Sequence, residues 1–154
     1  MEIRKVTEHK KDYISLLLIA DESEEMIDKY LEHGEMFLLY DNGAKAVCVV
    51  TKETDDIYEL KNIAVIPECQ RRGYGKRLIE FLLSYYNDCK IMFVGTGDID
   101  WIIDFYYSCG FKESHRIENF FTDNYDHPMF EDGKQLVDMV YLKLEQEKIS
   151  GKQI

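Results

Sequence analysis

The order of apolar and polar positions predicts alternating helices and strands along the chain. Weak alternation over residues 1–7 predicts a first strand, and apolar residues at helical spacing predict helices over 11–20 and 23–34. Ser23 is a suitable N-cap for the second of these helices. Residues 35–50 read "EMFLLYDNGAKAVCVV", two apolar runs around an Asn-Gly pair, and therefore predict a β-hairpin.

The second half of the chain continues the same alternation. The apolar pattern of residues 57–65 predicts a strand that ends before Pro67. The pattern of residues 71–86 predicts an amphipathic helix. Without repeats, linkers or low-complexity tracts, residues 1–154 are expected to form one mixed α/β domain with central strands flanked by helices. The remaining expected elements are strands at 90–97, 111–121 and 136–145, a helix at 98–110 and a polar loop that contains 124–134.

Length and composition indicate an ordinary folded domain. The 154 residues are 45% hydrophobic and 13% aromatic, which argues against disorder. No apolar run approaches the ~20 residues of a membrane span, and the polar N-terminus lacks a secretory signal, so a cytoplasmic protein is expected. The four cysteines contain no C-x-x-C pair, so neither zinc ligation nor a disulfide framework is expected.

The charge balance limits the possible ligands. With 30 Asp and Glu against 19 Lys and Arg, the net charge is -11, which speaks against nucleic-acid binding. An acidic chain suits a cationic ligand such as a polyamine, although solubility is the simpler explanation. An anionic ligand would need a local basic patch, and the stretch "PECQRRGYGKRL" provides four basic residues and two glycines.

The glycines of this stretch follow a strand and open a helix. Helix N-termini present unpaired N–H groups to an anion, and glycine lets the backbone approach it closely.

The Walker A and dinucleotide-binding sequence patterns do not match this stretch, because Gln70, Arg77 and Leu78 stand where these patterns require other residues. The alternative is a basic helix start that only offsets nearby carboxylates, which leaves the two glycines unexplained. The pattern that remains is Val65, Pro67, Gln70, Gly73 and Gly75.

Two segments resemble the GNAT superfamily of N-acetyltransferases: "IAVIPECQRRGYGKRLIEFL" and "FYYSCGF". The resemblance implies a mixed, mostly antiparallel central sheet with splayed strands four and five, flanked by helices. It also implies acetyl-CoA as co-substrate and no metal. A backbone N–H near the splay would stabilise the thioester oxyanion.

The resemblance also implies roles for individual residues. Tyr106, four residues before Gly110, stands where the family places the general acid, and Glu59 where some members carry the base. The alternatives are a packed aromatic ring for Tyr106 and a solvated strand-end carboxylate for Glu59. Ile99 stands where many members carry an asparagine that contacts the cofactor. The backbone of Ile63, Ala64 and Val65 would pair with pantetheine, and Arg71, Arg72, Gly73, Tyr74, Gly75 and Lys76 would bind the pyrophosphate.

The resulting hypothesis is an N-acetyltransferase that moves an acetyl group from acetyl-CoA to a primary amine by direct attack. The alternative is a non-catalytic acyl-CoA-binding sensor or interaction module on the same fold. The acceptor would be a small molecule or peptide, with no nucleic-acid or membrane partner, and a homodimer is possible. His127 and Glu131 could line the acceptor site but are expected at the surface, and Trp101 and Tyr107 are expected in the core.

Overall fold

A computed structural model describes residues 1–146 of the chain. Its contacts form two compact units, Met1–Cys89 and a second that begins at Lys90, and each is described by itself below. Among residues 1–146, no helix is long and apolar enough to cross a membrane.

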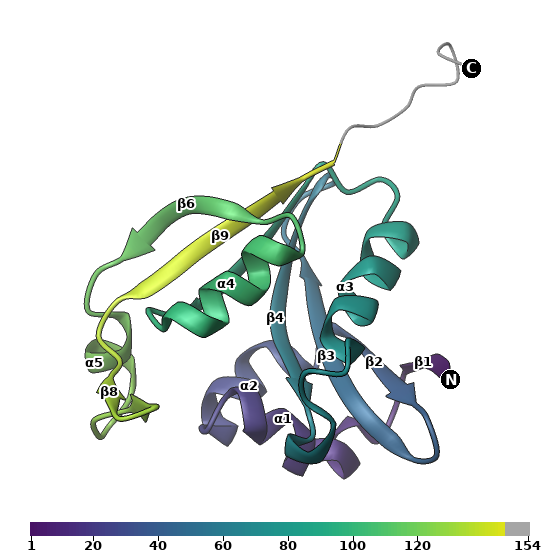
Figure 1. Cartoon of the computed structure of the whole chain (residues 1–154), viewed down its shortest axis with the longest axis horizontal. Coiled ribbons are helices and arrows are strands. Elements are labelled where there is room, and N and C mark those ends of the chain that lie inside the picture. Colours follow the sequence, from purple (N-terminus) through teal and green to yellow (C-terminus); the bar gives the residue numbers. More distant parts are fainter. Residues whose placement is uncertain (147–154) are drawn as a thin grey trace. The chain divides into compact units, whose positions relative to one another are not determined.

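The first unit contains a four-stranded antiparallel sheet (Figure 1). The predicted hairpin forms, and its turn has positive φ at Asn42 (56°) and Gly43 (111°), the residue types that adopt this conformation most easily. The two strands of the hairpin are nearly continuous apolar runs because helices cover both of their faces. In sheet order the strands are β1 (Glu2–Val6), β2 (Glu35–Tyr40), β3 (Ala44–Lys52) and β4 (Ile57–Val65).

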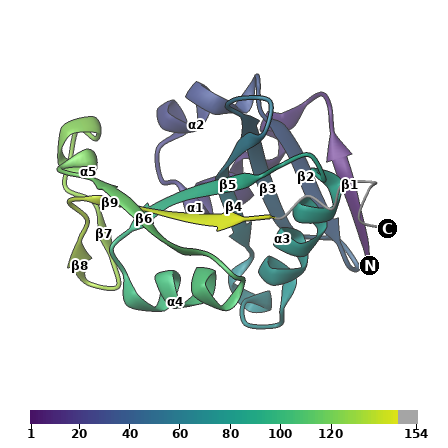
Figure 2. The same cartoon turned by 90° about the horizontal axis from the view of Figure 1, so that it is seen from above.

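Alternate residues of β2 point to opposite faces of this sheet, and different helices cover the two faces (Figures 1 and 2). Met36 and Leu38 pack with the short helix α1 (Ile14–Ala20) and with α2 (Glu24–Leu31). Phe37 packs against aromatic rings of α3 (Tyr74–Tyr85). Two 3-10 turns, η1 (Lys10–Tyr13) and η2 (Pro67–Cys69), precede α1 and α3.

An irregularity interrupts the pairing of β3 with β4. Val49 pairs with Asn62 and Val50 with Leu60, so Lys61 is one extra residue on β4. Such a β-bulge changes the direction of the strand and re-aims its side chains. The bulge lies inside the strand that carries Glu59 and residues 63–65.

The second unit contains a three-stranded antiparallel sheet in the order β5, β9, β6. The ends of two flexible side chains pack against Gly95 and Gly97 of β5: a Cβ there would lie 2.5 Å from Met139 Sδ and 2.6 Å from Leu136 Cδ2, so these side chains would have to shift. The elements are β5 (Ile91–Gly97), α4 (Asp100–Ser108), β6 (Lys112–Ile117), α5 (Phe120–Asn124), the small hairpin β7 (Phe130–Glu131) and β8 (Lys134–Gln135), and β9 (Met139–Glu145).

The expected mixed α/β class is confirmed, and all strand pairs within either unit are antiparallel. Some local predictions were wrong. The strand expected to reach residue 121 ends at Ile117, because α5 begins at Phe120, and the loop around 124–134 contains the β7–β8 hairpin. Trp101 and Tyr107 are 47% and 46% exposed instead of buried. The splay of the fourth and fifth strands and the single domain over residues 1–154 stay predictions.

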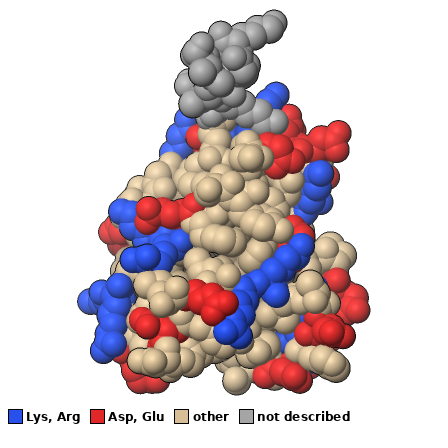
Figure 3. All heavy atoms as spheres, turned by 90° about the vertical axis from the view of Figure 1, so that its right-hand side faces the viewer, with Lys and Arg blue, Asp and Glu red and all other residues tan. Residues whose placement is uncertain are grey.

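Charged side chains of both signs are mixed on the face drawn in Figure 3. The net charge of -11 is therefore not gathered into a patch of one sign on that face.

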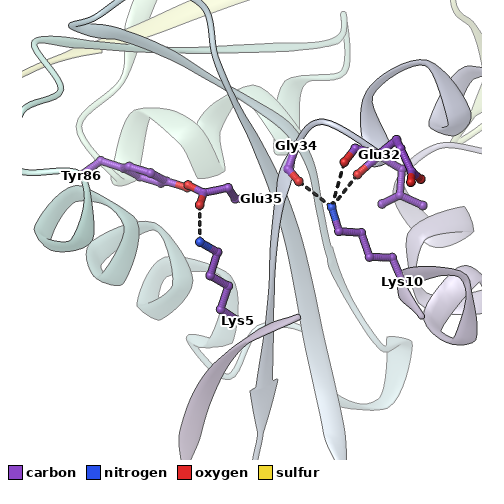
Figure 4. Close-up of polar contacts among 7 residues, drawn as sticks. Lys5, Lys10, Glu32, Gly34, Glu35 and Tyr86 are labelled. Atoms are coloured by element: carbon purple, nitrogen blue, oxygen red, sulfur yellow. Dashed lines mark hydrogen bonds and ion pairs between the residues drawn. The ribbon is translucent and has the colours of Figure 1, made fainter. Parts of the chain in front are cut away.

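Two groups of polar contacts fix the segment that joins α2 to β2 (Figure 4). The Lys10 ammonium donates to the carbonyl oxygens of Leu31 (2.8 Å) and Gly34 (2.6 Å), at the end of α2 where carbonyls lack partners. Glu35 accepts from the Tyr86 hydroxyl at 2.6 Å and pairs with Lys5. Burial alone would raise the pKa of Glu35, but the hydrogen bonds from Lys5 and Tyr86 outweigh it and hold this pKa below its usual value.

We expect Glu35→Gln to lower the free energy of unfolding by about 1 kcal/mol at pH 7, after allowance for solvent screening. Since the folded pKa lies below the unfolded value of ~4.3, the carboxylate's contribution is present above that value. It is lost as the pH falls through the folded pKa, so the two proteins should become equally stable in acid. Urea unfolding from pH 7 to pH 3 measures this difference. Glu118→Gln, at an exposed position, is the control, and a difference independent of pH would contradict the prediction.

Candidate functional site

The connection from β4 to α3 is held to the end of β4 by local hydrogen bonds. After Pro67, the Cys69 N–H donates to the Ile66 carbonyl oxygen at 2.9 Å, which forms the 3-10 turn. The side-chain amide of Gln70 donates to the carbonyl oxygen of Val65 at 3.1 Å. The conformation of residues 70–73 is therefore tied to the strand that precedes them.

Residues 71–73, just before α3, are exposed to solvent. Arg71 and Gly73 have left-handed φ values of 66° and 85°. Among residues 1–146, no acceptor is present for the N–H groups of residues 71–76, and the first bond of α3 runs from Arg77 N to Gly73 O at 3.0 Å. A row of unpaired N–H groups at a helix N-terminus is a binding site for an anion.

Gly73 is needed here for its backbone conformation. A Cβ at this position would meet nothing within 4 Å, so space is not the constraint, but φ of 85° disfavours any residue with a side chain. Because Gly73 occupies the N-cap position, no side chain caps the helix. The amides stay available to a ligand.

The basic side chains of the turn carry unneutralised charge. Arg71, Arg72, Lys76 and Arg77 are exposed, and none forms an ion pair within the described part of the chain. The alternative of a basic turn that only offsets carboxylates therefore has no ion pair to support it. Four free cations beside unpaired amides suit a polyanionic group such as a pyrophosphate.

Tyr74 adds a contact that the sequence did not predict. Its hydroxyl donates to Asp41 Oδ2 at 2.7 Å, which joins the first turn of α3 to the β2–β3 turn. The hydrogen bond to Asp41 raises the pKa of Tyr74. Because the two residues are far apart in the sequence, no local pattern indicates this pair.

β4 carries the other residues expected at the cofactor. Within the first unit, Ile63, Ala64 and Val65 pair with β3 on one side, and no other strand of that unit pairs with β4. Glu59 lies inside the strand opposite Thr51, with 12% of its side chain exposed. Its carboxylate lies 3.0 Å from the ammonium of Lys61, so it is neither at the end of the strand nor fully solvated.

Tyr106 lies on α4 in the second unit. Its ring packs against Phe105 and Phe111, with centroid distances of 5.1 and 5.6 Å, and the residue is 6% exposed. Burial, and to a lesser extent the Cys109 thiol, raises its pKa, so the hydroxyl stays protonated over the physiological range. The described residues supply no partner for this hydroxyl, and it is not among the fully enclosed polar atoms, so its oxygen keeps some accessible area. A hydrogen-bond donor is thus available on an otherwise buried ring.

Other expected residues take part in different contacts. Ile99 is buried and precedes α4, where it offers no polar side chain to a cofactor. Asp98 accepts from Arg116 at 3.0 Å, a contact that the sequence did not indicate. His127 is exposed and pairs with Asp126, whose pKa this hydrogen bond lowers, and Glu131 lies in β7. Among residues 1–146, no group of three His, Cys, Asp or Glu side chains is arranged to hold a metal ion.

Comparison with known proteins identifies relatives of the whole chain. Residues 32–113 match the model of the acetyltransferase (GNAT) domain family. The chain is 33% identical over 142 residues to the uncharacterized N-acetyltransferase YvbK of Bacillus subtilis, covering 90% of this chain and 92% of that protein.

Two solved structures are similar over nearly their full lengths. A GNAT family acetyltransferase from Elizabethkingia anophelis with acetyl-CoA bound is 34% identical, with a TM-score of 0.87, over 94% of this chain and 97% of that one. A Bacillus subtilis acetyltransferase in complex with CoA is 31% identical, with a TM-score of 0.85, over 95% and 99%.

We expect Gly73→Glu to weaken coenzyme A binding at least about tenfold, because the carboxylate repels the pyrophosphate and the new side chain disfavours the backbone conformation that exposes the amides. Calorimetric titration of the folded variant with coenzyme A measures this loss.

Gly133→Glu is the matched control for this experiment. Gly133 also has a positive φ (76°) and open space around its Cα, but it lies in the β7–β8 hairpin. Undiminished affinity in Gly73→Glu, or an equal loss in Gly133→Glu, would mean that the phosphates bind elsewhere.

Proposed function

Because the chain belongs to the GNAT family of acetyltransferases, we propose that it is an acetyl-CoA-dependent enzyme that acetylates a primary amine. The observation that carries the proposal is the start of α3, where unpaired N–H groups and four unpaired cations lie together. The similar structures with acetyl-CoA or CoA bound support this choice of co-substrate. We further propose that residues 1–154 act as one catalytic domain.

In this proposal the pyrophosphate binds the N–H groups of Arg71, Arg72, Gly73, Tyr74, Gly75 and Lys76. Charge-assisted hydrogen bonds from amides and guanidinium groups hold phosphate oxygens strongly. The pantetheine arm pairs with the backbone of Ile63, Ala64 and Val65, as an added strand does. In this proposal the thioester lies near the β-bulge at Lys61, and a backbone N–H of that stretch stabilises the oxyanion.

The reaction is a direct transfer. The amine nitrogen attacks the thioester carbonyl carbon, and the C–O π electrons move to oxygen, which the backbone N–H stabilises. The tetrahedral intermediate then collapses, the C–S bond breaks, and the electron pair leaves on sulfur. A base or water takes one proton from the ammonium before the attack and a second from the nitrogen of the intermediate, the leaving sulfur takes up one proton, and the products are an amide and the thiol of coenzyme A.

Tyr106 is the proposed donor to the leaving sulfur. A phenol is a weaker acid than a thiol of pKa ~8.5, so the transfer is slightly uphill in water. Burial raises the pKa of Tyr106 and would also raise that of a thiol held beside it, so the two effects offset each other and the transfer stays slightly uphill. An accessible hydroxyl without a partner in the described chain suits this role.

Glu59 is the proposed base, acting directly or through a water molecule. An amine of pKa ~10.4 is protonated at pH 7, so removal of its proton costs roughly 4–5 kcal/mol and assistance is useful. The Lys61 ammonium lies 3.0 Å from the Glu59 carboxylate and fixes its position. Glu59 would then have to accept a proton while it shares its oxygens with Lys61.

The second candidate function is an acyl-CoA-binding sensor on the same fold. Both functions need the anion site at α3, but only the enzyme needs a proton donor such as Tyr106. The test is thiol release from acetyl-CoA with a panel of amines: spermidine, an aminoglycoside, amino acids, and peptides with a free N-terminus or lysine. Release above the rate without amine supports the enzyme, whereas coenzyme A binding without release from any amine supports the sensor.

We expect Tyr106→Phe to lower kcat by about 10² or more, because general acids contribute roughly 10²- to 10⁴-fold, while the affinity for coenzyme A changes less than about twofold. Steady-state kinetics and calorimetry on the same preparations separate the two quantities.

Tyr107→Phe is the control, since Tyr107 is the adjacent tyrosine on α4 and is largely exposed. Turnover at the wild-type rate in Tyr106→Phe would leave Tyr106 as a packing residue. A parallel loss of coenzyme A affinity would make it a binding residue instead.

A further inference from the structure

The first turn of α3 is weakly held by its own backbone. Gly73 is the N-cap and supplies no side-chain hydrogen bond, and Gly75 follows inside the first turn. Glycine loses more backbone entropy on folding than any other residue, so two glycines at these positions weaken the turn. The amides that would bind an anion therefore depend on another interaction to keep them in place.

The side chain of Tyr74, which lies between the two glycines, supplies such an interaction. Its hydroxyl donates to Asp41 Oδ2 at 2.7 Å, and both residues are half-buried. Hydrogen bonds to a carboxylate are charge-assisted and therefore stronger than those between neutral groups. Because this bond raises the pKa of Tyr74 above its ordinary value, the hydroxyl remains a donor at physiological pH.

Asp41 belongs to a well-defined turn of the first sheet. The β2–β3 turn has positive φ at Asn42 and Gly43, and the Asp41 N–H donates to the Gly43 carbonyl oxygen at 2.9 Å. Leu39 and Ala46, which pair with each other just inside the turn, are fully buried. The acceptor of the Tyr74 hydroxyl is therefore fixed to the core of the sheet.

The same hairpin also holds the other end of the connection between β4 and α3. The N–H of Ile66, just after β4, donates to the Lys45 carbonyl oxygen of β3 at 3.0 Å. Residues 67–73 thus lie between two contacts with the β2–β3 hairpin, one at Ile66 and one at Tyr74. Of these two contacts, the one made by Tyr74 acts on the helix that carries the amides.

The charge of Asp41 does not favour an anion at this place. Its carboxylate is bonded to the first turn of α3, and like charges repel, so it opposes the binding of a polyanion there. Any benefit of Asp41 to an anion site is therefore conformational and is delivered through Tyr74. Removal of the Tyr74 hydroxyl leaves this charge in place and removes the contact alone.

We propose that Tyr74 is a positioning residue, whose hydroxyl ties the start of α3 to the β2–β3 turn and so keeps the N–H groups of residues 71–76 in the arrangement that binds the pyrophosphate. The proposal rests on the proposed function, because it takes the anion to be the pyrophosphate of coenzyme A. Binding groups that are already ordered lose less freedom when the ligand binds, which raises affinity. The β2–β3 turn, 33 positions from Tyr74 in the sequence, thereby becomes a part of the cofactor site.

The main test compares Tyr74→Phe with Tyr86→Phe by calorimetric titration with coenzyme A. Both substitutions remove one hydroxyl that donates to a carboxylate, at the first turn and at the C-cap of the same helix. We expect Tyr74→Phe to weaken coenzyme A binding at least about fivefold, whereas Tyr86→Phe should change it less than about twofold. Equal affinities of the two variants would overturn the proposal.

A double-mutant cycle with Asp41→Ala separates positioning from direct contact with a phosphate. Because Asp41→Ala already removes the contact, adding Tyr74→Phe to it should change the affinity for coenzyme A less than about twofold. A further fivefold loss in the double variant would mean that the hydroxyl binds the pyrophosphate itself, which overturns the positioning role. Asp41→Ala alone also removes a repulsive charge, so the cycle carries the test.

Thermal unfolding and kinetics separate positioning from a purely structural role. With an amine that supports thiol release, Tyr74→Phe should raise the KM for acetyl-CoA by the factor seen in calorimetry, with kcat changed less than about twofold. A lower Tm with unchanged affinity for coenzyme A would make Tyr74 a structural residue only.

The titration of the wild type distinguishes failure of this proposal from failure of the proposed function. If the wild type does not bind coenzyme A, the proposed function has failed and the role of Tyr74 fails with it. If the wild type binds coenzyme A and Tyr74→Phe binds it equally well, the positioning role alone is overturned.

Discussion

The site depends on one constraint, which is that α3 begins without a side-chain cap. The contrast with α2 in the same unit is direct: there the Ser23 hydroxyl accepts from Met26 N at 3.2 Å and so occupies one free amide. At α3 the N-cap is Gly73, which has no side chain, and both Arg71 and Gly73 have left-handed φ values. Unpaired N–H groups in a folded protein are unfavourable unless solvent or a ligand satisfies them, and here a polyanion can do so. The four unpaired cations around them make the same place attractive in a chain of net charge -11.

β4 carries both the residues that would bind the cofactor and the polar residues that do not belong in an ordinary core strand. The bulge at Lys61 divides it: Glu59 lies before the bulge and pairs with Lys61 itself, and Asn62 and residues 63–65 lie after it. An asparagine with an unpaired enclosed oxygen and a carboxylate with 12% exposure both cost stability. The apolar layers on the two faces of the sheet supply the stability that allows this, with α1 and α2 packed on one face and the aromatic rings of α3 on the other.

Two adjacent tyrosines of α4 differ in burial, and burial raises the pKa of the enclosed one. The Tyr106 ring is enclosed by Phe105 and Phe111, and its pKa is raised, so the hydroxyl is a donor at any physiological pH. Tyr107 is 46% exposed. A helical period of 3.6 residues places neighbours about 100° apart, so the two tyrosines point in different directions from the helix. The helix thus presents a single buried phenol beside an exposed one.

The sequence by itself determined the order of the elements as far as β6, the bounds of β4, the cap at Ser23 and the glycine-bearing turn, because hydrophobic period, capping and turn chemistry are local properties. The resemblance to the GNAT family rested on the same local stretch, and the comparisons confirm it. Only the tertiary structure decided which polar groups meet. The bulge at Lys61 depends on the register between two strands, and the contacts of Asn62 with Leu17 and Tyr30 join residues 45 and 32 positions apart. The exposure of Trp101 and the helix at Phe120 were likewise set by packing against residues elsewhere in the second unit, which a local pattern does not encode.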